Sequence, residues 1–311
     1  MINLSEEIRN ARPSGPTAVT LGVFDGVHLG HNAIINTLKA DAIELGITPV
    51  ALTFSSHPLL TLKPRLEIKE LTSLEDRIQL LNNAGAEYVI PINFTNDVSN
   101  LTAREFLVLL KRDLQLKHLV IGPNFALGFE RRGTATVLQK LGSELDFSVK
   151  IVDPYLIGST TISSTNIRQA LQTGNLGKVS LMLGRYFSLK GTVIRGQGRG
   201  GEELGFPTCN LSMNKTQILP SDGIFAAWAT VKNKRYKAAA SVGTKPTFES
   251  DGARVVEAYI LDFDADVYGL DIRLEFVETI RNQQKFNSAD ELISQMKIDV
   301  DQIKGILTEN R

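Results

Sequence analysis

The chain has 311 residues, of which 42% are hydrophobic and 22% charged, and its 34 basic residues balance its 34 acidic residues. Because this balance holds in both halves of the chain, composition disfavours a nucleic-acid-binding function. The single Cys209 excludes an internal disulfide framework and a cysteine-based zinc site.

The first residues of the chain and its hydropathy indicate where in the cell we expect the protein. Residues 1–17 lack a basic start followed by an apolar core, so we expect no signal peptide. No apolar run reaches the length that crosses a membrane. We therefore expect a soluble, cytoplasmic protein with no membrane partner, and we leave a homo-oligomer open.

The first half alternates short apolar runs with helical patterns. Gly46 ends the first predicted helix, Ser73 begins the second, and Thr102 with Glu105 forms a capping box at the third. This alternation predicts a doubly wound parallel sheet. The predicted strands are residues 17–24, 47–54, 87–92, 118–122 and 147–152, and the predicted helices are residues 31–46, 73–85, 102–116 and 133–145.

The pattern changes near residue 184 to short strands separated by Gly, Pro, Asn and Asp, which indicates a small antiparallel barrel. A C-terminal helix begins at the capping box of Ser288 and Glu291. Residues 171–185 are predicted to be a helical connector. The predicted strands are residues 191–196, 206–211, 224–231, 235–243, 254–261 and 271–278.

Residues 22–31, GVFDGVHLGH, join the first predicted strand to the first predicted helix, at the sheet edge where such folds bind ligands. His28 and His31 fit three interpretations: metal ligands, a buried histidine pair, or donors to a phosphate. No third metal ligand lies near them in the sequence. Glycines at a helix start allow a phosphate to approach the free N–H groups, so we favour a phosphate site.

Residues 162–168, ISSTNIR, place three hydroxyl side chains at a second helix start, with Arg168 one turn further on. On their own these are ordinary N-cap residues and a surface charge. Together with the earlier HxGH they resemble the nucleotidylyltransferase superfamily, in which the first motif holds a triphosphate and the second stabilises the leaving pyrophosphate. Charge builds on the leaving phosphates during such a transfer, so fixed donors must meet it.

Further motifs narrow the resemblance to prokaryotic bifunctional FAD synthetases. TFSSHP (53–58) and IGPNFALGFERRGT (121–134) complete the first half, and GRGGEELGFPTCNL (198–211), SVGTKPTF, VVEAYILDFDADVYG and IRNQQKF follow in the second. The chain departs from the usual motifs at Asn124, Cys209, Asn282 and Gln283. The resemblance implies an FMN adenylyltransferase domain in residues 1–184 and a riboflavin kinase domain in residues 185–311. It implies Mg²⁺ as cofactor, with ATP, riboflavin, FMN and FAD as substrates or products.

The resemblance also implies the site residues. For adenylyl transfer it assigns catalysis to His28, His31 and Arg168, and substrate binding to Gly22, Phe24, Asp25, His57, Asn124, Ser163, Ser164 and Thr165. For the kinase it assigns binding to Gly205, Phe206 and Pro207, Mg²⁺ to Thr208 and Asn210, and the general base to Glu257.

Physical chemistry supports the kinase assignments. The sequence has no GxxxxGK[ST] loop, so another device must hold ATP. Thr208 and Asn210, two apart on a strand, face the same side and offer the hard oxygen ligands that suit Mg²⁺. Riboflavin's hydroxyl needs a base, although an acid on a strand such as Glu257 is most often only exposed to solvent. Two rival functions remain: nucleotidyl transfer to another acceptor, and an inactive flavin-binding module.

Overall fold

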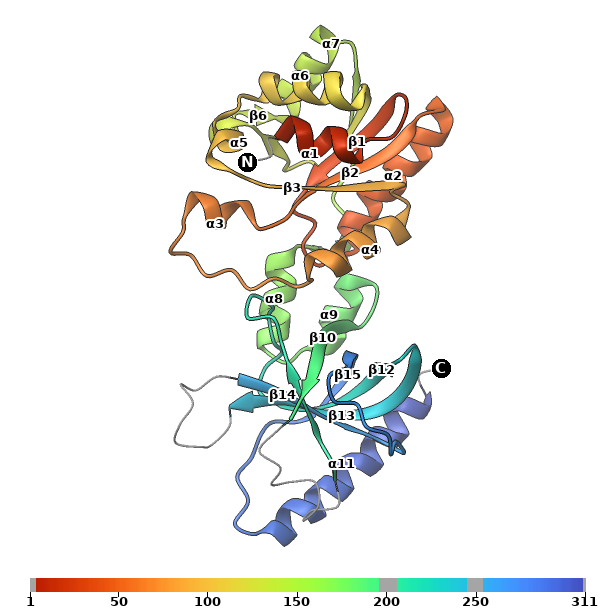
Figure 1. The fold of residues 1–311 in the computed structure, drawn as a ribbon, viewed down its shortest axis with the longest axis vertical. Helices are drawn as coiled ribbons and strands as arrows, with labels where there is room; N and C mark the ends of the chain where they lie inside the picture. The colour runs from red at the N-terminus through yellow and green to blue at the C-terminus, as the bar shows by residue number, and fades with distance from the viewer. Residues whose placement is uncertain (1–3, 196–205, 245–253, 310–311) are drawn as a thin grey trace. The chain divides into compact units, whose positions relative to one another are not determined.

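The computed structural model describes residues 4–195, 206–244 and 254–309. Internal contacts divide the chain into two compact units, Met1–Ser164 and Thr165–Arg311. In Figure 1 the first unit runs from red to green and the second from green to blue. Gly205, one of the predicted binding residues, lies outside the described residues.

The first unit is built on the predicted parallel sheet, which is confirmed. Its five strands lie in the order β3-β2-β1-β4-β7, and all neighbouring pairs are parallel. The strand order reverses between β1 and β4, and doubly wound sheets bind ligands beyond the carboxyl ends of their strands at such a point. The strands are β1 Thr17–Gly22, β2 Thr48–Phe54, β3 Tyr88–Ile92, β4 Leu116–Ile121 and β7 Ser148–Ile151.

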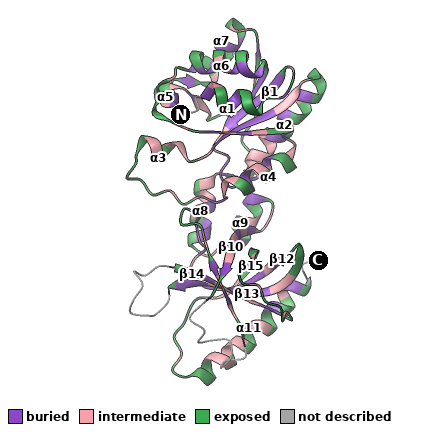
Figure 2. Ribbon diagram, in the orientation of Figure 1, coloured by how far each residue is buried: buried purple, intermediate pink, exposed green. Residues whose placement is uncertain are grey.

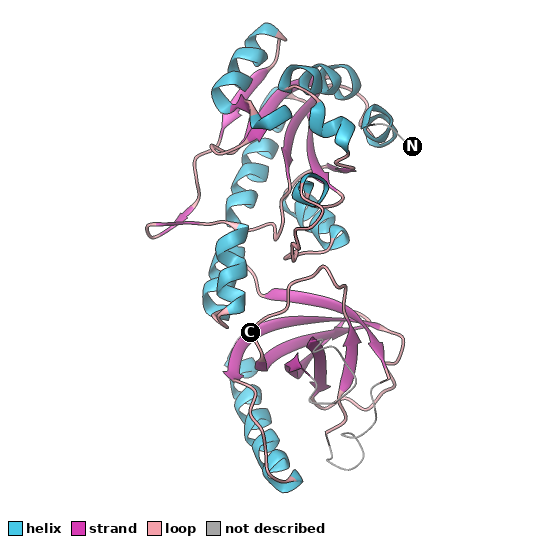
Figure 3. Cartoon of the chain, turned by 90° about the vertical axis from the view of Figure 1, so that its left-hand side faces the viewer, coloured by secondary structure: helices cyan, strands magenta, loops and turns pink. Residues whose placement is uncertain are grey.

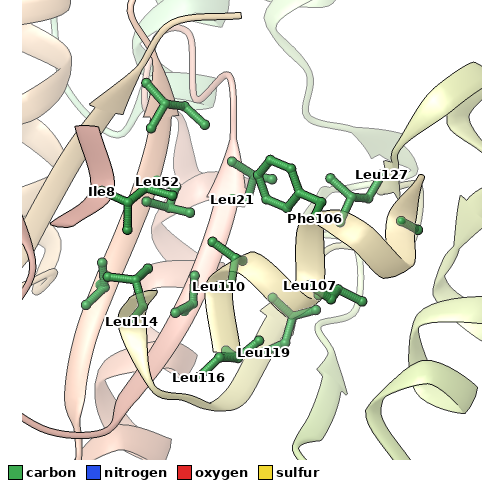
Figure 4. Close-up of a cluster of buried hydrophobic side chains, with 14 of the residues drawn as sticks. Ile8, Leu21, Leu52, Phe106, Leu107, Leu110, Leu114, Leu116, Leu119 and Leu127 are labelled. Atoms are coloured by element: carbon green, nitrogen blue, oxygen red, sulfur yellow. The ribbon is translucent and has the colours of Figure 1, made fainter. Parts of the chain in front are cut away.

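Helices cover both faces of this sheet. Leu21 and Leu52 pack against α1 Leu4–Ala11, α6 Ala103–Leu114 and α7 Ala135–Glu144, and Figure 4 shows α6 leucines among these side chains. Ala18 and Ala51, which alternate with them, pack against α2 Leu29–Leu45 and α4 Leu74–Ala84. Each fully buried leucine contributes about 1.5–3 kcal/mol to the free energy of folding, so burial of these side chains stabilises the first unit.

Local signals set several helix ends as predicted. Ser73 caps α4, Thr102 and Glu105 form the capping box of α6, and Gly46 ends α2 with a left-handed φ of 64° that glycine adopts without strain. Several boundaries differ from the prediction by a few residues, and two of them lie between β1 and α2. Strand β1 ends at Gly22 because Phe24 has a positive φ, and α2 begins at Leu29 because His28 is its N-cap.

Helix α1 was not predicted, and a buried carboxylate on α6 holds it. The Asp113 side chain is 1% exposed and accepts hydrogen bonds from Ser5 at 2.5 Å and Arg9 at 2.8 Å, both on α1. Burial by itself raises the pKa of Asp113, but the hydrogen bonds from Arg112, Ser5 and Arg9 outweigh it and hold the pKa well below its usual range. The carboxylate therefore stays ionised and ties α1 to α6.

Other short elements also lie outside the predicted set. They are α3 Pro58–Leu62, α5 Asn96–Asn100, β5 Ala126–Leu127, a 3-10 turn Phe129–Arg131, β6 Gly133–Thr134, β8 Leu156–Ile157 and β9 Thr160–Thr161.

The second unit is the predicted antiparallel barrel, which is confirmed. Its six strands close in the order β10-β11-β14-β13-β12-β15, and Figure 3 shows them with the long C-terminal helix α11 Ala289–Glu309. Ile303 and Leu307 of α11 are buried beside Ala226 and Val277. The strands are β10 Phe187–Ile194, β11 Cys209–Ser212, β12 Gly223–Val231, β13 Lys234–Thr244, β14 Arg254–Ile260 and β15 Asp271–Arg281. Two strands are shifted from the prediction: β10 begins at Phe187 and not at residue 191, and β11 begins at Cys209 and not at residue 206, so Thr208 directly precedes the strand that holds Asn210.

Two helices precede the barrel and pack on it, α8 Ser164–Gln172 and α9 Leu176–Leu183. The Ser221 N–H donates to the Leu171 carbonyl at 3.0 Å, and the Thr279 hydroxyl donates to the Gly174 carbonyl at 3.1 Å. The predicted connector is therefore helical and belongs to the second unit. Figure 2 shows buried residues along the strands of both units.

Candidate active sites

The turn between β1 and α2 has an unusual backbone. Phe24, Gly26 and Val27 have φ angles of 49°, 84° and 36°. This region is costly for Phe and for β-branched Val, and such strain persists only where the surroundings impose it. Both side chains are almost fully buried, at 3% and 1% exposure, and hold the turn in this shape. Strained turns of this kind are concentrated at functional sites.

The turn leads into the two histidines. His28 is the N-cap of α2, and its Nδ1 accepts the backbone N–H of His31 at 3.3 Å. The two rings stack with centroids 3.6 Å apart and 14° between their planes. A Cβ on Gly30 would lie 3.2 Å from the His28 ring, which explains the glycine between the histidines. The pair therefore sits at a helix N-terminus, where N–H groups and the helix dipole favour an anion.

A network of hydrogen bonds fixes the turn from outside. The buried Asp25 carboxylate accepts the N–H of Leu71 at 2.9 Å and of Thr72 at 3.2 Å. The Gly26 N–H donates to the Thr72 hydroxyl at 3.1 Å, and the Ser164 hydroxyl donates to the Asp25 carbonyl at 2.8 Å. Ser163 and Ser164 are thus next to the turn, as expected for two motifs of one site.

Thr165 and Arg168 fall in the second compact unit. Arg168 lies one turn into α8. Their proximity to the histidine turn stays a prediction.

A cavity of about 710 Å³ opens at the ends of β1 and β2. Three predicted residues, Gly22, His57 and Asn124, line it. His57 is the N-cap of α3 and accepts the Leu59 N–H at 3.2 Å. Aromatic side chains supply much of the wall: Phe54, Phe94, Phe125 and Phe129.

Arg131 is a cavity residue to which sequence analysis gave no role. It lies on the wall, its φ is 57°, and its guanidinium donates to the Asn124 carbonyl at 3.3 Å. Arg131 lies inside the motif of residues 121–134, which could have drawn attention to it. The sequence does not show, however, whether Arg131 or the adjacent Arg132 lines the cavity.

In the barrel, Glu257 stands on a polar face. On β14 it is directly opposite Asn210 of β11 and Ser241 of β13. Its neighbours Val256 and Ala258 are buried in the barrel, so the alternation of a strand places Glu257 on the outer face. There it lines a cavity of about 240 Å³ together with Thr208.

The wall of this cavity opposite the strands is α11. Leu292, Met296 and Val300 contribute apolar surface, so one end of the cavity is apolar and the other holds Glu257. Phe206 also lines it, and the Phe206 ring meets Tyr259 edge-on at 5.3 Å.

Thr208 borders a second cavity of about 270 Å³, which Pro207 and Asp264 also line. Thr208 therefore borders both cavities. The next residue, Cys209, points the other way, and burial raises the pKa of its thiol. Cys209 is a free thiol, as expected for a chain with one cysteine.

Arg281 and Asp299, which were not among the predicted site residues, form an ion pair. The Arg281 guanidinium donates to both Asp299 oxygens at 2.8–3.0 Å, and Gln295 donates to the same carboxylate at 2.9 Å. Asp299 is 4% exposed, and both ends of the pair line the smaller cavity. The pair joins β15 to α11 and so holds the apolar wall against the barrel.

The interpretation of His28 and His31 as metal ligands finds no support among the described residues. They contain no group of three or more His, Cys, Asp or Glu side chains that could hold a metal ion.

Comparison with known proteins also finds two parts in the chain. A family described as FAD synthetase matches residues 11–166, and a family described as riboflavin kinase matches residues 183–307. A bifunctional riboflavin kinase/FMN adenylyltransferase from Listeria monocytogenes is 36% identical over 90% of this chain and 89% of its own length. The protein of the same description from Bacillus subtilis is 34% identical over 91% of this chain and 90% of its own.

A solved structure resembles the whole chain. The crystal structure of a protein described as a macrolide-efflux protein from Streptococcus pneumoniae has a TM-score of 0.88, with 30% identity over 96% of both chains. In this chain, the part that the structure describes contains no helix long and apolar enough to cross a membrane.

The doubly wound part and the barrel part of the chain thus match two enzyme families, so the chain is an enzyme of two activities. The chain belongs to the family of bifunctional riboflavin kinase/FMN adenylyltransferases.

Proposed function

We propose that the two parts of the chain carry one of the two activities each. The enzyme phosphorylates riboflavin to FMN with one ATP, and it adenylylates FMN with a second ATP to give FAD and pyrophosphate. We assign adenylyl transfer to residues 1–184 and phosphorylation to residues 185–311. The family matches at residues 11–166 and 183–307 support this division, while residues 165–184 group with the barrel by contact.

The histidine turn beside the large cavity is the observation that carries the adenylyl transfer. His28 and His31 would hold ATP phosphates at the start of α2, with Ser163, Ser164, Thr165 and Arg168 facing the leaving pyrophosphate. The flavin ring would lie among the phenylalanines of the 710 Å³ cavity, near His57 and Asn124. Gly22, Phe24 and Asp25 would shape the turn. An FMN phosphate oxygen attacks the α-phosphorus, and pyrophosphate leaves with the electrons of the broken bond.

The two cavities that Thr208 borders support the kinase assignment. The apolar wall of α11 suits the flavin ring, and the second cavity would take ATP, with Phe206 and Pro207 beside the two. The substrates would then meet at Thr208. Glu257 would take the proton of the flavin hydroxyl as its oxygen attacks the γ-phosphorus, and ADP leaves. The role of Gly205 is a proposal from the resemblance alone.

Mg²⁺ fits the residues of this face. Thr208 and Asn210 offer neutral oxygens, and Asn210 is directly opposite Glu257 in the strand register. Mg²⁺ prefers a few protein oxygens together with phosphates and water, which such a sparse set provides. When bound, it would neutralise phosphate charge. We further propose a cytoplasmic enzyme, because both reactions consume ATP, with small-molecule partners and no nucleic acid.

Incubation of the purified protein with riboflavin, MgCl₂ and ATP tests the function. We expect FMN to appear first and FAD to follow, with one pyrophosphate released per FAD. Formation of FMN without FAD would indicate that the first unit transfers a nucleotidyl group to an acceptor other than FMN. Formation of neither would indicate a binding module.

A further inference from the structure

Arg77 is a fully buried cation that the assigned chemistry does not use. It lies on α4, and its side chain is 0% exposed. Arginine is almost never fully buried unless it is paired, because removing its charge from water is costly. An apolar side chain of similar volume would fill the same space without this cost, so packing alone does not explain the guanidinium.

The contacts of Arg77 lie at the end of β2. One terminal nitrogen donates to the Phe54 carbonyl at 2.8 Å and lies 3.5 Å from the Thr53 hydroxyl. The other terminal nitrogen pairs with Glu70 at 3.3 Å. Its Nε is buried and has no hydrogen-bond partner among the residues that the structure describes. The guanidinium is therefore held by two segments, the β2 end and the loop that follows α3.

Both segments contact residues of the proposed adenylyl-transfer site. The Thr53 hydroxyl donates to the Val23 carbonyl at 3.1 Å, and Val23 and Phe54 both line the 710 Å³ cavity. On the other side, Glu70 directly precedes the two N–H groups that hold Asp25 in the histidine turn.

We propose that Arg77 is a positioning residue for adenylyl transfer. It fixes the cavity wall at Val23 and Phe54, and the loop that holds Asp25, in one arrangement, without touching either substrate. This inference rests on the proposed function of the first unit. A displacement of about 1 Å at a reacting group can cost roughly 100-fold in rate, so a loosened wall has a large effect.

The test is the steady-state kinetics of FAD formation from FMN and ATP by the full chain carrying Arg77→Met. We expect the KM for FMN to rise about tenfold and kcat to fall about tenfold, together roughly 100-fold in kcat/KM. Riboflavin phosphorylation should stay within about twofold of wild type. Thr53→Val, which removes the hydroxyl that joins β2 to Val23, should raise the KM for FMN in the same direction.

The KM separates positioning from a merely structural role. A structural residue lowers the amount of folded enzyme, which lowers the apparent kcat and leaves the KM unchanged. Asp113→Asn is the matched control, because it weakens a buried ion pair of the same unit, with Arg9 and Arg112, whose members do not line the 710 Å³ cavity. It should leave the KM for FMN unchanged.

Arg77→Met with a wild-type KM for FMN overturns the proposal, and so does a rise of the same size in Asp113→Asn. If Arg77→Met does not fold, Arg77→Lys decides. Lysine keeps a donor for the Phe54 carbonyl, so an intermediate KM supports the proposal and a wild-type KM overturns it. Wild-type enzyme that makes no FAD from FMN would instead reject the proposed function.

Discussion

Removal of the His31 ring tests the phosphate site with little damage to the fold. The cap on α2 survives His31→Ala, because His28 accepts the backbone N–H of His31 and not its side chain. The variant loses the stack on His28 at 3.6 Å and the edge contact with Phe24 at 5.2 Å. Two such ring contacts are worth about 1–3 kcal/mol. A domain with a stability of about 5–15 kcal/mol therefore stays folded.

The effect on catalysis is much larger. Loss of one donor to the charge that develops in a transition state typically costs about 100- to 1,000-fold in kcat, or roughly 2.7–4 kcal/mol. We expect His31→Ala to lose FAD formation by this factor while FMN formation from riboflavin continues, as measured by chromatography of both flavins.

His118→Ala is the control for this experiment. His118 is also buried in the first unit, where it contacts Asp41 at 2.9 Å and Ser148 at 2.6 Å. It should leave the adenylylation rate of the folded protein near wild type. FAD formation by His31→Ala within about threefold of wild type would refute the phosphate site. Release of a bound zinc ion by this substitution would instead support the metal interpretation.

Three further predictions follow from other parts of the chain. Glu257→Gln should lower the rate of riboflavin phosphorylation about 100- to 10,000-fold, because glutamine cannot accept the proton. The variant should still convert supplied FMN to FAD. A near-normal rate of phosphorylation would contradict the assignment of Glu257 as the general base. A fragment of residues 165–311 should fold and make FMN, with a higher melting temperature than 185–311, which lacks α8 and α9; equal melting temperatures would show that these helices do not stabilise the barrel. Because the folded pKa of Asp113 is depressed, its stabilisation is present above the unfolded pKa of about 4 and declines as the pH falls through the folded value. Urea unfolding of wild type and Asp113→Asn should therefore show a difference in the free energy of unfolding that shrinks below about pH 4, and a constant difference would contradict the ionised carboxylate.

Local patterns predicted most of the fold. Alternating strands and helices specify the parallel sheet, and Ser73, Thr102 and Gly46 set helix ends through contacts with near neighbours. The barrel strands follow from alternation and turn residues. Elements that depend on distant partners were missed: α1 forms on a carboxylate more than 100 residues away in sequence.

In the candidate sites, too, residues in local motifs were predicted and residues that depend on distant contacts were missed. Motif order located the histidine turn, Thr208 and Glu257. The residues that support them gave no local signal, because their roles arise from tertiary contacts. Arg77 appears as an ordinary charge in a helical pattern, and Arg281 meets Asp299 only when α11 packs on the barrel. The left-handed backbone of Phe24 and Val27 likewise follows from burial and not from residue type.

The most direct test of two separate sites in one chain is a mixture of two inactive variants. Glu257→Gln alone, supplied with riboflavin and ATP, should make neither FMN nor FAD, and His31→Ala alone should stop at FMN. Mixed in one tube, the two proteins should form FAD, because FMN released by one kinase unit can enter the adenylyl-transfer site of the other protein. If each variant behaves as predicted alone but the mixture forms no FAD, the assignment of the two reactions to two independent sites is contradicted.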